Sequence, residues 1–291
     1  MSNPDQIQRF IFEDADLRGV LVGLEHSYHE ALARHAYPAA VQTLLGEMLA
    51  AVGLLSSTLK FEGRLSLQAV GDGPVRLVMA ECNHQRDLRG IARWSEQLGD
   101  EQGLAELLGK GQLAITIEPD QGKRYQGIVP MDHEHLAQCL EAYFEQSEQL
   151  ATRIQLAADD QRAAGFMLQA LPGNKSADHE DWDRITLLGS TLSGDELLGL
   201  DNEPLLFRLF HEERVRLYGP DALHFSCDCS RERSLSALRT VSQAELESII
   251  AEQGVIEMGC QFCNEHYRFD AVDIAALFAG SSAIAGTGHT H

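Results

Sequence analysis

Cys227-Asp228-Cys229 is followed, 30 residues later, by Cys260-Gln261-Phe262-Cys263, and these two short segments hold four of the six cysteines in the chain. Each pair can place two sulfur atoms on one small cation, and two pairs complete the tetrahedral four-thiolate shell that Zn²⁺ prefers. The other two cysteines, Cys82 and Cys139, stand alone in apolar-rich surroundings, as ordinary buried cysteines do. The spacing therefore predicts one zinc site per chain, with Cys227, Cys229, Cys260 and Cys263 as its ligands.

The first pair has a spacing that suits a metal better than a disulfide. In an extended chain, residues two apart point to the same side, with Cα atoms roughly 6.5–7 Å apart. That separation lies at the upper limit of what a disulfide tolerates, so a bond between Cys227 and Cys229 would be strained and easily reduced. We therefore predict a switch, with thiolates on zinc in the reduced protein and disulfides without zinc in the oxidised protein.

The composition indicates a reducing compartment. The 291 residues are 44% hydrophobic and 23% charged, which is typical of a soluble globular protein. Met1 to Asp16 is polar and acidic, without the pattern of a secretory signal. The longest apolar stretch, Met48 to Leu55, is much shorter than the ~20 residues that span a bilayer. We expect a cytoplasmic protein, where paired cysteines indicate metal or redox chemistry rather than the structural disulfides of a secreted protein.

The charge distribution argues against nucleic acid as a partner. The formal net charge is −21, and residues 178–291 alone carry 20 acidic and 8 basic residues, a net charge of −12. Around the cysteines, Ser226 to Asp273 has 9 acidic and 4 basic residues, a net charge of −5. A zinc module that binds DNA or RNA needs the opposite sign, because Lys and Arg on phosphates supply most of the affinity.

Residues 1–177 predict an α+β domain that resembles an α/β sandwich with a largely antiparallel sheet. Between Ala39 and Lys60 large apolar residues recur at three- and four-residue spacing, which predicts a core helix. Further helices are expected over His26 to His35 and Asp132 to Gln149. Short strands separated by glycine-containing or polar turns are expected over Arg9 to Glu13, Leu17 to Leu24, Leu65 to Ala69, Val75 to Ala80, Gly90 to Trp94, Gln112 to Glu118, Arg124 to Val129, Arg153 to Ala157 and Gly165 to Leu171.

Residues 178–224 predict a helical linker with too few large apolar residues for a core of its own. Its helices are expected over Trp182 to Leu192, Gly194 to Leu200 and Pro204 to Glu213, before a strand at Val215 to Tyr218. We expect this linker to lie against the first domain.

Residues 225–280 form the expected zinc module, and residues 281–291 a disordered Gly/Ser/Thr-rich tail. Within the module, Ser242 to Glu245 is a capping box that opens a helix over Ala244 to Glu252, which stops before Gly254. A strand at Tyr267 to Phe269 precedes a last helix that ends near Ala279. At about 55 residues the module is marginal without help, whereas structural zinc contributes roughly 10–16 kcal/mol of apparent binding free energy. Loss of the metal should therefore unfold it.

The sequence closely resembles the bacterial redox-regulated thirty-three-kilodalton heat-shock chaperone family, whose zinc signature is a C-x-C pair and a C-x-x-C pair about thirty residues apart. The resemblance covers nearly the whole chain, and Ala151, where proline is expected after QSEQL, is a small departure. The other shared motifs are RFIFEDADLRG (Arg9 to Gly19), LKFEG (Leu59 to Gly63), GDGP (Gly71 to Pro74), AEC (Ala80 to Cys82), YFEQSEQL (Tyr143 to Leu150), LFHEE (Leu209 to Glu213) and FSCDCSRER (Phe225 to Arg233).

The resemblance implies a chaperone that holds unfolding proteins under oxidative stress without ATP, and not an enzyme. The reduced, zinc-bound monomer would be inactive. Oxidation would form Cys227–Cys229 and Cys260–Cys263 disulfides and release zinc, and the C-x-x-C pair should oxidise first because its ring closes more easily. The module and the linker would then loosen, so that residues 1–177 bind unfolded clients and dimerise, with no nucleic acid or membrane as partner.

Two other functions remain open on the residues alone. A thiol–disulfide oxidoreductase could use Cys260 and Cys263, but such a motif normally follows a strand and opens a helix. Here Gly259 precedes the pair and Asn264 to Arg268 leads into a strand, which favours a zinc knuckle. A nucleic-acid-binding zinc module is the third hypothesis, and its acidic charge counts against it.

Overall fold

The computed structural model describes residues 4–57, 62–96, 98–99, 103–171 and 179–282. The chain divides into two compact units, Met1–Ser226 and Cys227–His291. Each unit has a hydrophobic cluster of its own, and we describe the two units separately.

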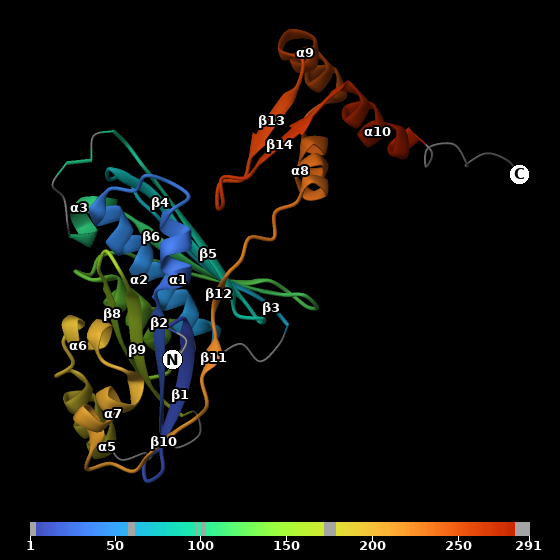
Figure 1. The fold of residues 1–291 in the computed structure, drawn as a ribbon. Helices are drawn as coiled ribbons and strands as arrows, with labels where there is room; N and C mark the ends of the chain where they lie inside the picture. The colour runs from blue at the N-terminus through green and yellow to red at the C-terminus, as the bar shows by residue number, and fades with distance from the viewer. Residues whose placement is uncertain (1–3, 58–61, 97, 100–102, 172–178, 283–291) are drawn as a thin grey trace, which may run out of the picture. The chain divides into compact units, whose positions relative to one another are not determined.

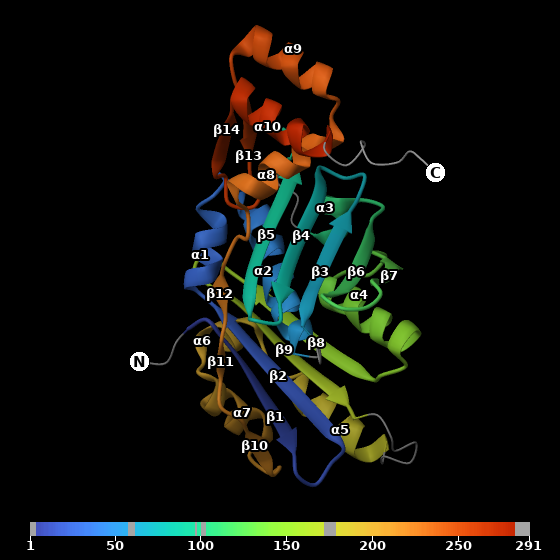
Figure 2. The same ribbon diagram turned by 90° about the vertical axis from the view of Figure 1, so that its right-hand side faces the viewer.

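The larger unit contains two six-stranded sheets, which we call sheet A and sheet B (Figures 1 and 2). Sheet A has the antiparallel order β10-β1-β2-β9-β8, and β11 also pairs with β1. Its strands are β1 (Gln6–Phe12), β2 (Leu17–Leu24), β8 (Thr152–Ala158), β9 (Ala163–Ala170), β10 (Val215–Leu217) and β11 (Asp221–Ala222).

Sheet B has the order β12-β5-β4-β3-β6-β7, with neighbouring strands antiparallel except for the parallel pair β12–β5. Figure 2 shows β5, β4, β3 and β6 side by side. Its strands are β3 (Gly63–Val70), β4 (Val75–Asn83), β5 (Asp87–Trp94), β6 (Gln112–Pro119), β7 (Tyr125–Pro130) and β12 (His224–Phe225).

Helix α2 (Ala39–Ser56) joins the two sheets, because its side chains pack in one cluster with residues of both. The close approach of α2 to each sheet requires a glycine at each contact. A Cβ on Gly46 would lie 2.7 Å from the Cβ of Ala158 in β8, and a Cβ on Gly90 in β5 would lie 2.9 Å from Leu45. Within the described residues, α2 is the one helix long and apolar enough to cross a membrane, but most of it is buried in this core.

The opposite face of sheet A is covered by α5 (His179–Gly189), α6 (Gly194–Gly199) and α7 (Asn202–Phe210), as Figure 1 shows. The two-residue period of β9 explains how one strand serves both faces. Ala163 and Met167 belong to the cluster around α2, whereas Phe166 and Leu168 belong to the cluster beneath these three helices. We call α5, α6 and α7 the linker helices.

The remaining helices of the larger unit are α1 (His26–Leu32), α3 (Leu104–Leu108) and α4 (Leu136–Tyr143). Helix α4 continues as a π-helix over Phe144–Glu148, which ends at Gln149 with a left-handed φ of 54°.

The smaller unit contains α8 (Arg231–Ala237), a short 3₁₀ helix (Leu238–Thr240), α9 (Gln243–Gln253), the hairpin β13 (Ile256–Gly259) and β14 (His266–Phe269), and α10 (Ala271–Ser282). The Ser242 side chain accepts a hydrogen bond from the Glu245 N–H and caps α9, and Gly254 ends that helix with φ 80°. The cap at Ser242 and the stop at Gly254 agree with the sequence prediction, but among the described residues the Glu245 side chain does not return the bond to the Ser242 N–H that would complete the predicted capping box. Six buried apolar residues form the core: Leu238, Leu246, Ile256, Phe269, Ile274 and Leu277.

The α+β class and the largely antiparallel pairing predicted from the sequence are confirmed, but the strands form two sheets rather than one meander. The predicted helix over Asp132 to Gln149 begins only at Leu136. The core helix predicted to Lys60 ends at Ser56, with residues 58–60 outside the described part. Helix α10 runs to Ser282, three residues beyond the predicted Ala279, and the tail predicted from residue 281 otherwise lies outside the described residues. The predicted boundary at residues 177 and 178 also falls outside them.

Candidate metal centre

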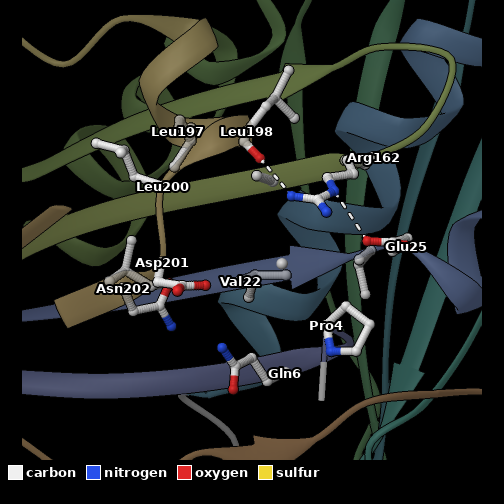
Figure 3. Close-up of a pocket in the computed structure, with 15 residues that line it drawn as sticks. Pro4, Gln6, Val22, Glu25, Arg162, Leu197, Leu198, Leu200, Asp201 and Asn202 are labelled. Carbon is white, nitrogen blue, oxygen red and sulfur yellow. Dashed lines mark hydrogen bonds and ion pairs between the residues drawn. The ribbon is translucent and has the colours of Figure 1, made fainter. Parts of the chain in front are cut away.

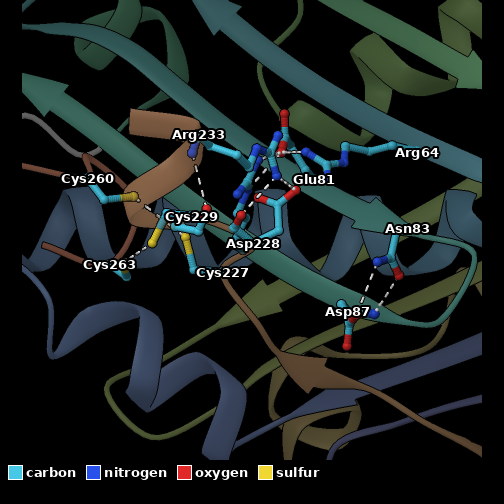
Figure 4. A network of polar contacts seen from close by, with 12 residues as sticks. Arg64, Glu81, Asn83, Asp87, Cys227, Asp228, Cys229, Arg233, Cys260 and Cys263 are labelled. Atoms are coloured by element: carbon cyan, nitrogen blue, oxygen red, sulfur yellow. Dashed lines mark hydrogen bonds and ion pairs between the residues drawn. The ribbon is translucent and has the colours of Figure 1, made fainter. Parts of the chain in front are cut away.

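Four cysteine sulfurs gather at one point of the smaller unit, and Figure 4 shows them together. The Sγ atoms of Cys227 and Cys260 are 3.6 Å apart, and those of Cys229 and Cys263 are 3.3 Å apart. All four Sγ atoms lie within 4.8 Å of one another, on half-buried residues without disulfides. The structure therefore brings together the four ligands predicted from the sequence.

The four sulfurs fit a tetrahedral zinc ion. A Zn–S bond of about 2.3 Å implies sulfurs about 3.8 Å apart around the metal, close to the two distances above. Neither His224 nor His266 belongs to this group of candidate ligand atoms. Four thiolates leave no open coordination position, which is typical of a structural zinc site rather than a catalytic one.

The hairpin between β13 and β14 positions the second pair of cysteines. Gly259 and His266 are opposite each other in the ladder, and the Cys260 N–H donates to the Glu265 carbonyl at 2.8 Å. The Asn264 N–H donates to the Cys260 carbonyl, also at 2.8 Å, and Asn264 takes a left-handed φ of 58°. This tight turn places both sulfurs on one side. The pair leads into a strand rather than opening a helix, as predicted for a zinc knuckle, but it also follows a strand, β13, which the sequence analysis did not predict.

Helix α8 fixes the first pair from its C-terminal side. Ser230 caps the helix by accepting from the Arg233 N–H, and the Arg233 guanidinium donates to the Asp228 carbonyl at 2.9 Å. The same guanidinium forms an ion pair with the Asp228 carboxylate (Figure 4). The residue between the two cysteines is therefore anchored to the following helix, which holds the C-x-C segment in place.

The electrostatics of the cluster favour a bound cation. Burial raises the pKa of Cys227 and of Cys263, and neighbouring sulfurs raise the pKa of Cys263 further. Burial acts in the same direction on Cys260, but hydrogen bonds from the backbone N–H groups of Cys263 and Phe262, together with those from the Cys227 and Cys263 side chains, lower its pKa overall. The Tyr267 hydroxyl donates to the Cys229 sulfur at 3.3 Å. Without a metal the four sulfurs cannot all be thiolates at low cost, whereas zinc binds the deprotonated form.

Arg231 links the elements around the site. Its guanidinium donates to the Arg268 carbonyl and pairs with Asp273 at 2.7 Å, and it lies 4.9 Å from the centre of the Phe269 ring. Helix α8 is thus joined to β14 and α10. Among the described residues, six buried apolar side chains and seven partly buried ones form the core, and these contacts and the cysteine cluster add to what holds the smaller unit together.

The two isolated cysteines lie apart from this chemistry. Cys82 and Cys139 are fully buried in the core of the larger unit, as expected. Burial raises the pKa of the Cys82 thiol to about 11, which keeps it protonated and unreactive at neutral pH.

A second group of possible ligand atoms was not predicted. Glu62, His84 and Asp120 lie beside β3, β4 and β6, and one ligand atom from each lies within 4.8 Å of the others. The sheet register alone brings them together, because no local motif joins residues so far apart in sequence. Both carboxylates are exposed, and exposed acidic groups often approach this closely without a metal.

Comparisons with known proteins agree on one family. The model of the family described as "Hsp33 protein" matches residues 5–270. The "33 kDa chaperonin" of Shewanella frigidimarina is 50% identical over 279 residues, covering 96% of this chain and 97% of that protein. The "33 kDa chaperonin" of Ectopseudomonas mendocina is 52% identical over 293 residues and 99% of each protein. The crystal structure of the 33 kDa chaperonin from Thermotoga maritima has a TM-score of 0.84, with 24% identity over 96% of this chain and 99% of that one, and shows the same fold.

Proposed function

The chain belongs to the Hsp33 family, a family of chaperones rather than enzymes, and we propose that it is a redox-regulated chaperone that holds unfolding proteins without ATP. In the reduced off state, Cys227, Cys229, Cys260 and Cys263 hold one Zn²⁺ per chain. The metal keeps the four sulfurs deprotonated and the smaller unit folded. The observation that carries this proposal is the approach of all four sulfurs to within 4.8 Å of one another.

Oxidation of the cysteines switches the protein on. A peroxide oxidises one thiolate of a pair to a sulfenic acid, and the second thiolate of that pair displaces hydroxide to form the disulfide. Each pair of thiolates thus gives up two electrons as its disulfide forms, and these electrons reduce one hydrogen peroxide to water or one alkyl peroxide to an alcohol and water. The Cys260–Cys263 pair closes first because its turn already places both sulfurs on one side, and Cys227–Cys229 follows. Four thiolates are lost, and the zinc leaves.

The face of sheet A beneath the linker helices is the proposed client surface. It carries large apolar side chains, including Phe10, Phe12 and Phe166, which pack against Phe210 of α7. If the linker helices leave, this face becomes a contiguous apolar patch, and such patches bind other proteins. Unfolded clients and a second copy of the oxidised chain would both cover it.

Apolar packing supplies most of the contact between the linker helices and sheet A, and the polar contacts among the described residues are few. The Gln155 side chain donates to the Gly189 carbonyl at 3.0 Å, and Asn202 donates to Gln8 at 2.9 Å. Near α6, Arg162 pairs with Glu25 at 3.0 Å and donates to the Leu198 carbonyl, beside a cavity of about 270 Å³ (Figure 3).

We place this protein in the cytoplasm, where a reducing pool of thiols keeps the switch off until oxidants rise. We propose neither nucleic acid nor a membrane as a partner, because the acidic smaller unit would repel phosphates.

A client-aggregation assay with zinc and free thiols counted in parallel tests the proposal. Oxidised protein should suppress aggregation of a thermally unfolding client, with about one zinc released and four thiols lost per chain, whereas reduced protein should not. Cys139→Ala is the matched control, because Cys139 lies outside the cluster and its loss should leave the switch intact. Equal protection by reduced, zinc-loaded protein would rule out the switch even if chaperone activity remained.

A further inference from the structure

Glu47 is a carboxylic acid that the proposed redox chemistry does not use. It lies on α2 and lines a cavity of about 390 Å³, whose wall includes Leu192, Gly194 and Leu197 from the linker segment. Residues of α4 and β8 complete the lining: His135, Ala137, Gln138, Glu141, Ile154, Gln155 and Leu156. Glu47, on the core helix α2, therefore lines the same cavity as residues of the linker segment.

The packing around β8 explains why Glu47 and the linker segment line the same cavity. β8 is the last strand of sheet A, so its outer edge pairs with no further strand in the described sheet. Gly46 places α2 against Ala158, and at the start of α6 a Cβ on Gly194 would lie 3.6 Å from the Cβ of Ala157. Adjacent residues of a strand point to opposite faces, so α2 and α6 approach β8 from its two sides. Glu47 lines the cavity between them.

No described basic group neutralises this carboxyl. The Glu47 side chain has no hydrogen-bond or ion-pair partner among the residues that the structure describes. On β8, Arg153 is paired with Glu141 of α4, whose carboxylate also accepts from the Ile154 N–H at 2.7 Å. His135 of α4 is exposed.

The other charged groups of the surrounding elements are acidic or already engaged. On α6, Asp195 is exposed, and Glu196 is paired with Arg208 of α7. Beyond α2, the Tyr28 hydroxyl donates to two backbone carbonyls, and Asp159 and Asp160 add negative charge near that hydroxyl.

A half-buried carboxylate without a partner among the described residues opposes the docked state. Removing a carboxylate from water without a partner is costly, so the group stays protonated or regains water. Burial alone raises the pKa of Glu47 to about 7. Release of the linker exposes Glu47 further to water and returns its pKa toward the ordinary value of about 4.5.

We propose that Glu47 sets how tightly the linker helices are held on sheet A, because its ionised carboxylate beneath α6 favours their release. This inference rests on the proposed function, because that function makes release of the linker helices a step of activation. A positioning residue of this kind touches neither client nor metal.

The sign of the pH effect follows from the two pKa values. The docked state binds the proton more tightly, so docking is strongest at low pH and weakens as the pH rises from about 4.5 to about 7. Above about pH 7 the docking equilibrium no longer changes with the ionisation of Glu47. A pKa difference between 4.5 and about 7 corresponds to a ceiling of roughly 300-fold in the docking equilibrium. Between pH 6 and pH 8 the docking equilibrium should weaken about tenfold.

Hydrogen exchange of the α5, α6 and α7 amides tests the inference in the reduced, zinc-loaded full chain, with rates corrected for intrinsic pH dependence. Wild type should open about tenfold more readily at pH 8 than at pH 6. Glu47→Gln should remove most of this dependence and close the linker by up to about 300-fold at pH 8. Glu47→Asp, which keeps a carboxyl, should retain the pH dependence.

Glu145→Gln is the charge-matched control, because Glu145 is exposed, and it should behave as wild type. A Glu47→Gln protein with the wild-type pH profile would overturn the inference, and so would a Glu145→Gln protein that closes the linker equally. A different result would contradict the proposed function without contradicting this inference. If Glu47→Gln closes the linker but reduced and oxidised protein protect a client equally, the inference stands and the redox switch does not.

Discussion

The two units of this protein are stabilised in different ways. The larger unit buries a continuous cluster that joins both sheets to α2, whereas the cluster of the smaller unit has six buried apolar side chains among the residues that the structure describes. A core of that size seldom supplies more than about 3–5 kcal/mol, whereas a structural zinc site supplies roughly 10–16. The comparison teaches that one unit should fold without metal and the other should not, so that loss of one ion can unfold part of the chain and spare the rest.

The sharpest way to break this comparison is to remove one proposed ligand. Cys229→Ser should abolish stoichiometric zinc binding and unfold the smaller unit, with a loss of most of the roughly 10–16 kcal/mol of apparent metal-binding free energy. Metal analysis and circular dichroism of the reduced protein check this. The larger unit should keep its thermal transition, and an unchanged zinc content would remove Cys229 from the ligand set.

The next largest effects are expected from truncating one buried leucine on each face of sheet A. Leu54 of α2 is fully buried in the cluster that joins the two sheets, and Leu205 of α7 is 1% exposed in the cluster between sheet A and the linker helices. Leu54→Ala should lower the global unfolding free energy of the larger unit by about 2–5 kcal/mol. Leu205→Ala should destabilise the packing of α5, α6 and α7 on sheet A by a similar free energy and leave the rest of the larger unit folded. Hydrogen exchange of the amides in these helices measures this local opening. If both variants lower global stability and linker protection alike, the linker helices belong to the permanent core.

A smaller effect tests the local structure of the smaller unit. Ser242→Ala removes the side chain that caps α9 and should cost about 1 kcal/mol. In zinc-loaded protein this loss should hardly change the fold, because the metal contributes far more. Denaturant titrations with and without a chelator measure the difference, and equal sensitivity to denaturant in both conditions would argue against metal-dependent stability.

Local patterns in the sequence predicted the features that depend on neighbouring residues. The spacing of Cys227, Cys229, Cys260 and Cys263 identified the cluster, because ligand spacing reflects the turn that holds each pair. The sequence also predicted the cap at Ser242 and the apolar repeat of α2, since both depend on three- and four-residue spacing.

Features that depend on pairing between distant segments were not predicted. β1 pairs with β10 some two hundred residues later, and the sequence does not encode that register locally. The division into two sheets, the short strands β11 and β12, and the Glu62–His84–Asp120 group all depend on such pairing. Glu47 was missed for a similar reason, because its burial depends on packing between α2, β8 and the linker segment.

Hydrogen exchange of both units in the reduced full chain, before and after a chelator removes the metal, tests the central claim most directly. The account predicts one zinc per chain at the start. After chelation, protection should be lost across α8, α9, β13 and β14 and retained across α2 and β3. Reduced protein that carries no stoichiometric zinc, or a smaller unit that stays protected without it, would contradict the account.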